Sequence, residues 1–192
     1  MGAPVSFPMP PSSLAPSPMA GPPVLRFQQV YAESAPFVWR TLRRLGVREA
    51  DLEDVSQEVF VVVHRRLADF DGSSAVRTWL FGICRRVAAD YRKRAHIRRE
   101  TAVSELPDGA QPPEQVEVVA RRQARALLDR ILDGLDEDKR AVFVLFELEQ
   151  WPMSEVAEAV GCPLQTAYAR LYAGRQYVQQ AVARARAEGG ET

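Results

Sequence analysis

Three groups of polar residues in this chain have types and spacings suited to binding other macromolecules. The first group is a patch of carboxylates and an amide at the start of an amphipathic segment: Asp51, Glu53, Asp54, Gln57 and Glu58. Paired carboxylates can perform acid–base chemistry or bind a metal ion, but the sequence places no histidine beside these. We therefore interpret the patch as a docking surface for a basic partner and predict neither a metal site nor a cofactor.

The spacing of this acidic patch has a structural explanation as well. Asp51, Asp54 and Glu58 follow one another at i, i+3 and i+7, which aligns them in a stripe beside the apolar face of a helix. Carboxylates in a first turn also stabilise the helix dipole, and this explanation suffices for Asp51. Glu58 lies two turns into the helix, where the dipole no longer accounts for it.

The second group lies on a segment that begins near Ser74. At about 3.6 residues per turn, four of its side chains share roughly one quadrant of a helix: Arg77, Phe81, Arg85 and Arg92. Trp79 falls on a neighbouring face. Cations bind a phosphate backbone and exposed aromatic rings stack on unpaired bases, so the segment is suited to single-stranded or melting DNA. The structural alternative is that both aromatic residues are core and the arginines form a solvated face.

The third group surrounds residues 161–163, between two segments with helical periodicity. Gly161 can adopt the left-handed conformation that ends one helix, and Pro163 favours the first turn of the next, as in a helix-turn-helix. Five apolar residues would pack across the corner: Val156, Ala157, Val160, Ala167 and Leu171. The outward face of the second helix, which fits a DNA major groove, would comprise Leu164, Gln165, Tyr168, Ala169 and Tyr172. The alternative is an ordinary corner of a helical bundle.

Helical periodicity covers most of the chain, so the predicted fold class is all-α, with two small helical domains joined by a flexible acidic linker. A first helix begins at Phe27, with Pro36 assigned to a first helical turn, and ends at Gly46. A second starts near Asp51, a third near Ser74, and two short helices flank the turn at 161–163. The expected organisation is a disordered proline-rich arm at 1–24, domains at 25–99 and 120–182, a linker at 100–119 and a tail at 183–192.

Charge is unevenly distributed along the chain although the totals balance. The 192 residues include 25 basic and 25 acidic side chains, so net charge alone does not indicate a nucleic-acid partner. Residues 85–99 hold seven lysines or arginines and one acidic residue, whereas every charge in 100–119 is negative. No apolar run could span a bilayer, and Cys84 and Cys162 lack metal-ligand spacing. We therefore expect a cytoplasmic protein without membrane insertion and with two buried free thiols.

Taken in order, these motifs resemble the extracytoplasmic-function (ECF) subfamily of bacterial sigma-70-type RNA polymerase sigma factors. Residues 51–60, 70–72 and 78–83 resemble region 2 of that family. Positions spread over the C-terminal part of the chain resemble region 4 of that family: Leu135, Glu147, 155–158, 161–163, Thr166 and 170–175. The match covers about residues 27–182, and the ordered pair of regions is more specific than either motif alone.

The resemblance implies a role for each surface in a protein that is not an enzyme. The docking partner would be core RNA polymerase, at the clamp helices and flap of its large subunits, with docking residues Asp51, Asp54, Gln57 and Glu58. The −10 element of promoter DNA would be read and opened by Phe70, Ser73, Ser74, Arg77, Trp79, Arg85, Arg86 and Arg92. The −35 element would be read by Gln165, Thr166, Tyr168, Ala169, Arg170, Tyr172 and Arg175. The family also implies control by an anti-sigma factor.

Several positions depart from the family pattern. Arg86 stands where asparagine is common, Tyr168-Ala169 where a basic residue and serine are common, and Pro152 where serine usually starts a helix. These changes bear on the −35 preference, and Tyr168 could contact thymine methyl groups there. Two other functions are alternatives to this one. A plain DNA-binding regulator would use only the helix-turn-helix, with 27–99 as a sensor or dimerisation domain, and a small enzyme would need a nucleophile–base pair that the sequence lacks.

Overall fold

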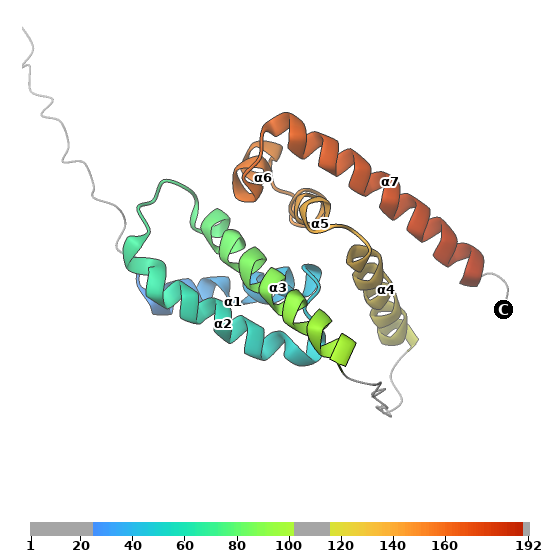
Figure 1. The fold of residues 1–192 in the computed structure, drawn as a ribbon, viewed down its shortest axis with the longest axis horizontal. Helices are drawn as coiled ribbons and strands as arrows, with labels where there is room; N and C mark the ends of the chain where they lie inside the picture. Colours follow the sequence, from blue (N-terminus) through green and yellow to red (C-terminus); the bar gives the residue numbers. More distant parts are fainter. Residues whose placement is uncertain (1–24, 102–115, 190–192) are drawn as a thin grey trace, which may run out of the picture.

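The computed structural model describes residues 25–101 and 116–189, and every regular element in these two ranges is helical (Figure 1). The predicted arm at 1–24, most of the predicted linker and residues 190–192 lie outside the described residues. The N-terminal module (residues 25–101) contains α1 (Phe27–Arg44), α2 (Leu52–Arg66) and α3 (Val76–Thr101). The C-terminal module (residues 116–189) contains α4 (Val116–Asp133), α5 (Glu137–Phe143), α6 (Met153–Val160) and α7 (Leu164–Gly189). The all-α prediction is confirmed.

The three helices of the N-terminal module pack around one apolar core. Each helix contributes residues at helical spacing that are almost inaccessible to solvent: Val38 and Leu42 from α1, Leu52, Val59 and Val63 from α2, and Leu80 and Phe81 from α3. Burying each of these side chains stabilises the module by about 1.5–3 kcal/mol. A short 3₁₀ turn, η1 (Glu49–Asp51), precedes α2, and a second one, η2 (Leu67–Asp69), follows it. The core thereby fixes which faces of α2 and α3 remain exposed.

The first helix differs from the prediction at Pro36, which lies in the interior of α1 and not in its first turn. Proline has no N–H to donate to the carbonyl four residues earlier. Both Pro36 and Ala32, whose carbonyl loses that partner, are exposed, so water can replace the missing hydrogen bond. The helix therefore continues through the proline until Arg44.

The C-terminal module contains the predicted helix-turn-helix. Gly161 ends α6 in the left-handed conformation (φ 68°), and the five predicted corner residues are buried. Asp136 begins α5 by accepting a hydrogen bond from the backbone N–H of Lys139 at 2.9 Å, and a π-helical turn, η3 (Val144–Leu148), continues that helix. α7 is much longer than the short helix predicted, because its second half packs on α4, with Tyr177 against Gly134.

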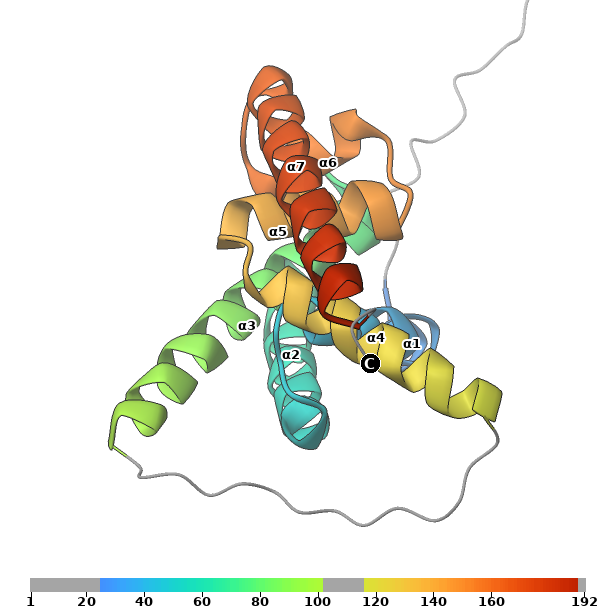
Figure 2. The ribbon, with the colours of Figure 1, turned by 90° about the vertical axis from the view of Figure 1, so that its right-hand side faces the viewer.

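The two modules pack directly against each other, which the sequence did not predict. α3 lies against α6, and α1 lies against α4 (Figure 2). Trp151, in the turn between η3 and α6, is only 4% exposed because it enters the N-terminal module. Its ring stacks on Phe37 of α1 at 6.1 Å between centroids and contacts Phe81 of α3.

A buried arginine crosses the same boundary. Arg140 of α5 is 2% exposed, and its Nη1 donates to the carbonyl of Leu45, at the end of α1, at 3.0 Å. Asp133 partly balances the charge at 3.1 Å. Burial lowers the pKa of Arg140 from its usual value, and nearby Arg92 adds to that effect. Gly46 makes room for this guanidinium: its φ is 92°, and a Cβ there would overlap Arg140 and approach Asp133 to 2.9 Å.

Substituting Gly46 by alanine is therefore expected to lower the free energy of unfolding by roughly 2–4 kcal/mol, through backbone strain and displacement of Arg140. Gly161→Ala is the matched control, because Gly161 also has a positive φ but a Cβ there would meet nothing within 4 Å. Its expected loss is about 1 kcal/mol. Urea denaturation of both variants measures the difference, and equal losses would contradict the role assigned to the Arg140 contact.

Candidate functional site

The predicted docking patch lies on the exposed face of α2. Asp54, Gln57 and Glu58 are all exposed, and Val61 extends the same face as an exposed apolar residue. Glu58 also pairs with Arg94 of α3, whose Nη2 lies 2.9 Å from its carboxylate, and this hydrogen bond raises the pKa of Arg94. The face is not covered by the C-terminal module, so a partner can reach it.

Asp51, the fourth predicted docking residue, has a different environment. Its carboxylate accepts hydrogen bonds from the Tyr91 hydroxyl at 2.6 Å and from Nε of Arg48 at 2.9 Å. The hydrogen bond between Arg48 and Tyr91 raises the pKa of Arg48 most, and the hydrogen bond to Asp51 raises it further. These contacts tie η1 to α3, so Asp51 supports the surface that carries the other three residues.

The loop before α3 and the first turns of that helix form one side of a pocket. Phe70 contacts the Trp79 ring at 5.1 Å, and Asp71 accepts a hydrogen bond from the Ser73 backbone at 2.9 Å. Hydrogen bonds from the Ser73 side chain and then from its backbone lower the pKa of Asp71. Ser74, half-buried Trp79 and exposed Arg86 line a pocket of about 370 Å³ together with Arg66, Asp90 and Glu158. An aromatic wall flanked by guanidinium groups is suited to a planar base and its phosphate.

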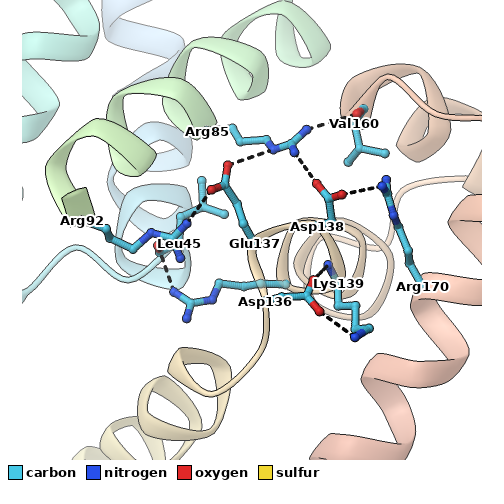
Figure 3. A network of polar contacts seen from close by, with 10 residues as sticks. Leu45, Arg85, Arg92, Asp136, Glu137, Asp138, Lys139, Val160 and Arg170 are labelled. Atoms are coloured by element: carbon cyan, nitrogen blue, oxygen red, sulfur yellow. Dashed lines mark hydrogen bonds and ion pairs between the residues drawn. The ribbon is translucent and has the colours of Figure 1, made fainter. Parts of the chain in front are cut away.

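The predicted basic quadrant of α3 faces the C-terminal module. Figure 3 shows Arg85 between Glu137 and Asp138 of α5: its Nη2 donates to Asp138 at 2.5 Å, and its Nη1 donates to the Val160 carbonyl at 3.1 Å. Arg92 pairs with Glu137 at 3.0 Å.

Arg77 completes the quadrant: it pairs with Glu155 of α6, and its guanidinium lies over the Trp151 ring at 4.6 Å. Phe81, grouped with these arginines in the sequence, is fully buried, which confirms for this ring the structural alternative of a core residue. The side chains of Arg98 and Arg99 are not among those that the structure describes.

The outward face of α7 carries large exposed apolar side chains. Leu164, Tyr168 and Tyr172 are 48%, 53% and 66% exposed, and Gln165 and Ala169 are exposed beside them, as predicted. Thr166 is half-buried. Two arginines of this helix form ion pairs within the module: Arg170 with Asp138, and Arg175 with Glu147 at 2.6 Å.

Sequence reasoning did not single out Glu137 and Asp138, the α5 carboxylates that pair with Arg85, Arg92 and Arg170. Glu137 and Asp138 follow the N-cap of α5, a position where acidic residues favour the helix dipole, so their presence had a sufficient local explanation. Trp151 and Arg140 fall within apolar and charged segments that carry no motif. Only packing between the two modules assigns them a role, since Arg140 and its acceptor Leu45, for example, are 95 residues apart in the sequence.

Among the described residues, Cys84 is buried and the metal-binding side-chain types do not cluster. Burial raises the pKa of the Cys84 thiol to about 12, so Cys84 is neutral and unreactive at ordinary pH. Within 25–101 and 116–189, no group of three or more His, Cys, Asp or Glu side chains could hold a metal ion. None of the helices in these ranges has the length and apolar character needed to cross a membrane.

Comparison with known proteins defines the family. The family model for sigma-70 region 2 matches residues 30–98, and the model for sigma-70 region 4 matches residues 125–178. The ECF RNA polymerase sigma-E factor of Haemophilus influenzae is 29% identical over 148 residues, which are 71% of this chain and 77% of that protein. The ECF sigma factor SigE of Mycolicibacterium smegmatis is 28% identical over 86% of this chain and 65% of that protein. The chain thus belongs to the ECF subfamily of sigma-70 RNA polymerase sigma factors.

Solved structures share the fold. CnrH, solved in complex with the cytosolic domain of CnrY, gives a TM-score of 0.62 at 24% identity, covering 82% of this chain and 88% of that one. RpoE from Bartonella quintana, solved with the anti-sigma factor NepR, gives a TM-score of 0.62 at 20% identity, covering 82% and 96%. At these identities the likeness supports the helical architecture and no particular contact.

Proposed function

We propose that this chain binds core RNA polymerase, brings it to promoters with matching −10 and −35 elements, and helps to open the DNA there. The protein contributes binding energy and no catalysis of its own, and it acts in the cytoplasm. The observation that carries the proposal is the presence of separate, accessible faces on one chain: the polar face of α2 and the outward face of α7.

The polymerase contact is assigned to Asp54, Gln57 and Glu58, with Asp51 holding η1 in place beneath them. Exposed carboxylates suit a basic surface on a partner, and the neighbouring exposed Val61 adds an apolar contact that excludes water. The contact with the flap of the polymerase is assigned to the C-terminal module.

The −10 contact is assigned to the loop Phe70–Ala75 and the first half of α3. The pocket lined by Ser74, Trp79 and Arg86 is suited to a base that has left the duplex, because Trp79 offers a stacking surface and Arg86 offers a cation. Ser73 and Phe70 shape the loop, while Arg77, Arg85 and Arg92 would contact phosphates along the strand.

The −35 contact is assigned to the N-terminal half of α7. Gln165 and Thr166 lie in its first turn, where a recognition helix approaches base edges, and Arg170 and Arg175 would contact phosphates. Tyr168, Ala169 and Tyr172 present apolar surface, which fits thymine methyl groups. An anti-sigma factor is a further proposed partner, since two related folds were solved bound to another protein.

Reconstituted transcription tests the function as a whole. Purified chain is expected to direct initiation by core RNA polymerase from specific sites in a fragmented genomic DNA library, and sequencing of the transcripts would reveal both promoter elements. Core enzyme alone is the control. If the chain neither joins core enzyme nor yields defined start sites, and instead binds duplex DNA tightly by itself, a plain DNA-binding regulator is the correct interpretation.

The double substitution Gln57→Ala with Glu58→Ala is expected to raise the Kd for core polymerase by about tenfold, because it removes polar contacts on an exposed face without disturbing the core. Gln29→Ala with Glu33→Ala is a matched control, since these two exposed α1 residues have the same types and are hydrogen-bonded at 3.1 Å. Fluorescence titration with core enzyme measures the Kd of both double variants. Equal affinities would show that α2 is not part of the docking surface.

Replacing Tyr168 by alanine is expected to change promoter choice by roughly tenfold at a −35 base pair, because a ring in the major groove discriminates thymine by apolar contact. Tyr168→Phe keeps the ring and should keep the preference. Transcription from promoters with each −35 base varied measures the effect, and affinity for core polymerase should stay the same. An identical promoter profile for the alanine variant would exclude this residue from base recognition.

A further inference from the structure

Aromatic rings of α1 and α2 gather where α1 begins. Phe27, in the first turn of α1, lies edge-on to Phe60 of α2 at 6.5 Å between centroids and to the His64 ring at 5.1 Å. Tyr31, one turn further along α1, contacts Phe27 at 6.2 Å and Phe60 at 4.6 Å. These four rings form one cluster, called here the aromatic cluster.

The aromatic cluster is only partly buried. Phe60 is 6% exposed and Phe27 is half-buried, but Tyr31 is 50% exposed and His64 is exposed as well. Apolar surface that stays in contact with water in this way gains free energy when another apolar segment covers it. The exposed side of the cluster is therefore suited to docking a segment without charges.

The chain itself supplies such a segment directly before the cluster. Residues 1–24 include eight prolines and no charged side chain, whereas 26% of the whole chain is charged. Within them, Pro8-Met9-Pro10-Pro11 has the P-x-x-P spacing of segments that dock in the polyproline conformation against aromatic rings. An uncharged segment also covers these rings without removing a charge from water.

The proline-rich arm is long enough to reach the aromatic cluster. The stretch between Pro11 and Leu25, the first described residue, spans roughly 40 Å when it is extended. Phe27 and Tyr31 lie within the first two turns of α1, so the arm has only to turn back on itself. Because a tethered segment has an effective concentration on the order of millimolar, a contact of modest affinity suffices.

We propose that residues 1–24 fold back and dock on the aromatic cluster of their own chain, with the prolines of the P-x-x-P segment against Tyr31 and Phe27. This docking requires neither polymerase nor DNA. His64 follows Val61 by three positions on α2, so the two side chains are neighbours on the helix surface. A docked arm therefore lies beside the face that is assigned to core polymerase.

The accessibility of tyrosines in the full chain tests the docking. Tyr31 and Tyr168 are matched probes, since they are 50% and 53% exposed in the folded modules. Fluorine NMR of the chain labelled with fluorotyrosine, with a soluble gadolinium chelate added, measures how far solvent reaches each ring. The Tyr31 signal is expected to broaden about threefold less than the Tyr168 signal, because the arm covers Tyr31 in most molecules. Tyr31→Phe and Tyr168→Phe assign the two signals.

Two full-length variants show whether the P-x-x-P segment is responsible. Pro10→Ser with Pro11→Ser removes that spacing and leaves both modules unchanged, so Tyr31 should become as accessible as Tyr168. Pro22→Ser with Pro23→Ser is the matched control, because it replaces another Pro-Pro pair of the arm and should keep Tyr31 protected.

Three results would overturn the docking. The first is equal broadening of the Tyr31 and Tyr168 signals in the unsubstituted chain. The second is protection of Tyr31 that persists in the variant without the P-x-x-P spacing. The third is protection that increases with protein concentration, which would assign the aromatic cluster to a contact between two copies of the chain.

Discussion

The arrangement of the whole molecule depends on one guanidinium, that of Arg140, which is buried where the two modules meet. A charge removed from water costs several kcal/mol unless polar partners replace the lost hydration. The carbonyl of Leu45 at 3.0 Å and the carboxylate of Asp133 at 3.1 Å supply them, one from each module. Because Arg140 lies on α5, its anchorage fixes the start of that helix, where Glu137 and Asp138 face the arginines of α3.

The arginines of α3 bind carboxylates of the C-terminal module in this structure. Guanidinium groups that suit phosphates also suit carboxylates, since both ligands offer paired oxygens to the same donors. In this structure Arg85 and Arg92 of α3 bind the carboxylates at the acidic start of α5. The exposed polar face of α2 takes no part in this contact.

The sequence predicts the features that depend on residues close together in the chain. It does not predict those that depend on packing between residues far apart in the chain. Gly161 ends α6 as expected, because a left-handed residue is a local requirement, and helical periodicity placed the starts of α2 and α3 correctly. Pro36 was misplaced, since helix interiors tolerate proline where the freed carbonyl reaches water. Phe81 was grouped with Arg77 and Arg85 because helical spacing places the three side chains close together, and only core packing decided that its ring is buried.

By itself, the sequence determined the helices, the turn of the helix-turn-helix, the family and the surfaces that carry its motifs, because these follow from residue types at short spacings. Only the tertiary structure decided what those surfaces face. Arg85 and Asp138 are 53 residues apart, and Arg77 and Glu155 are 78 apart. No periodicity links positions so distant; the packing of Trp151 and Arg140 between the modules brings them together, and that packing is a property of the folded chain.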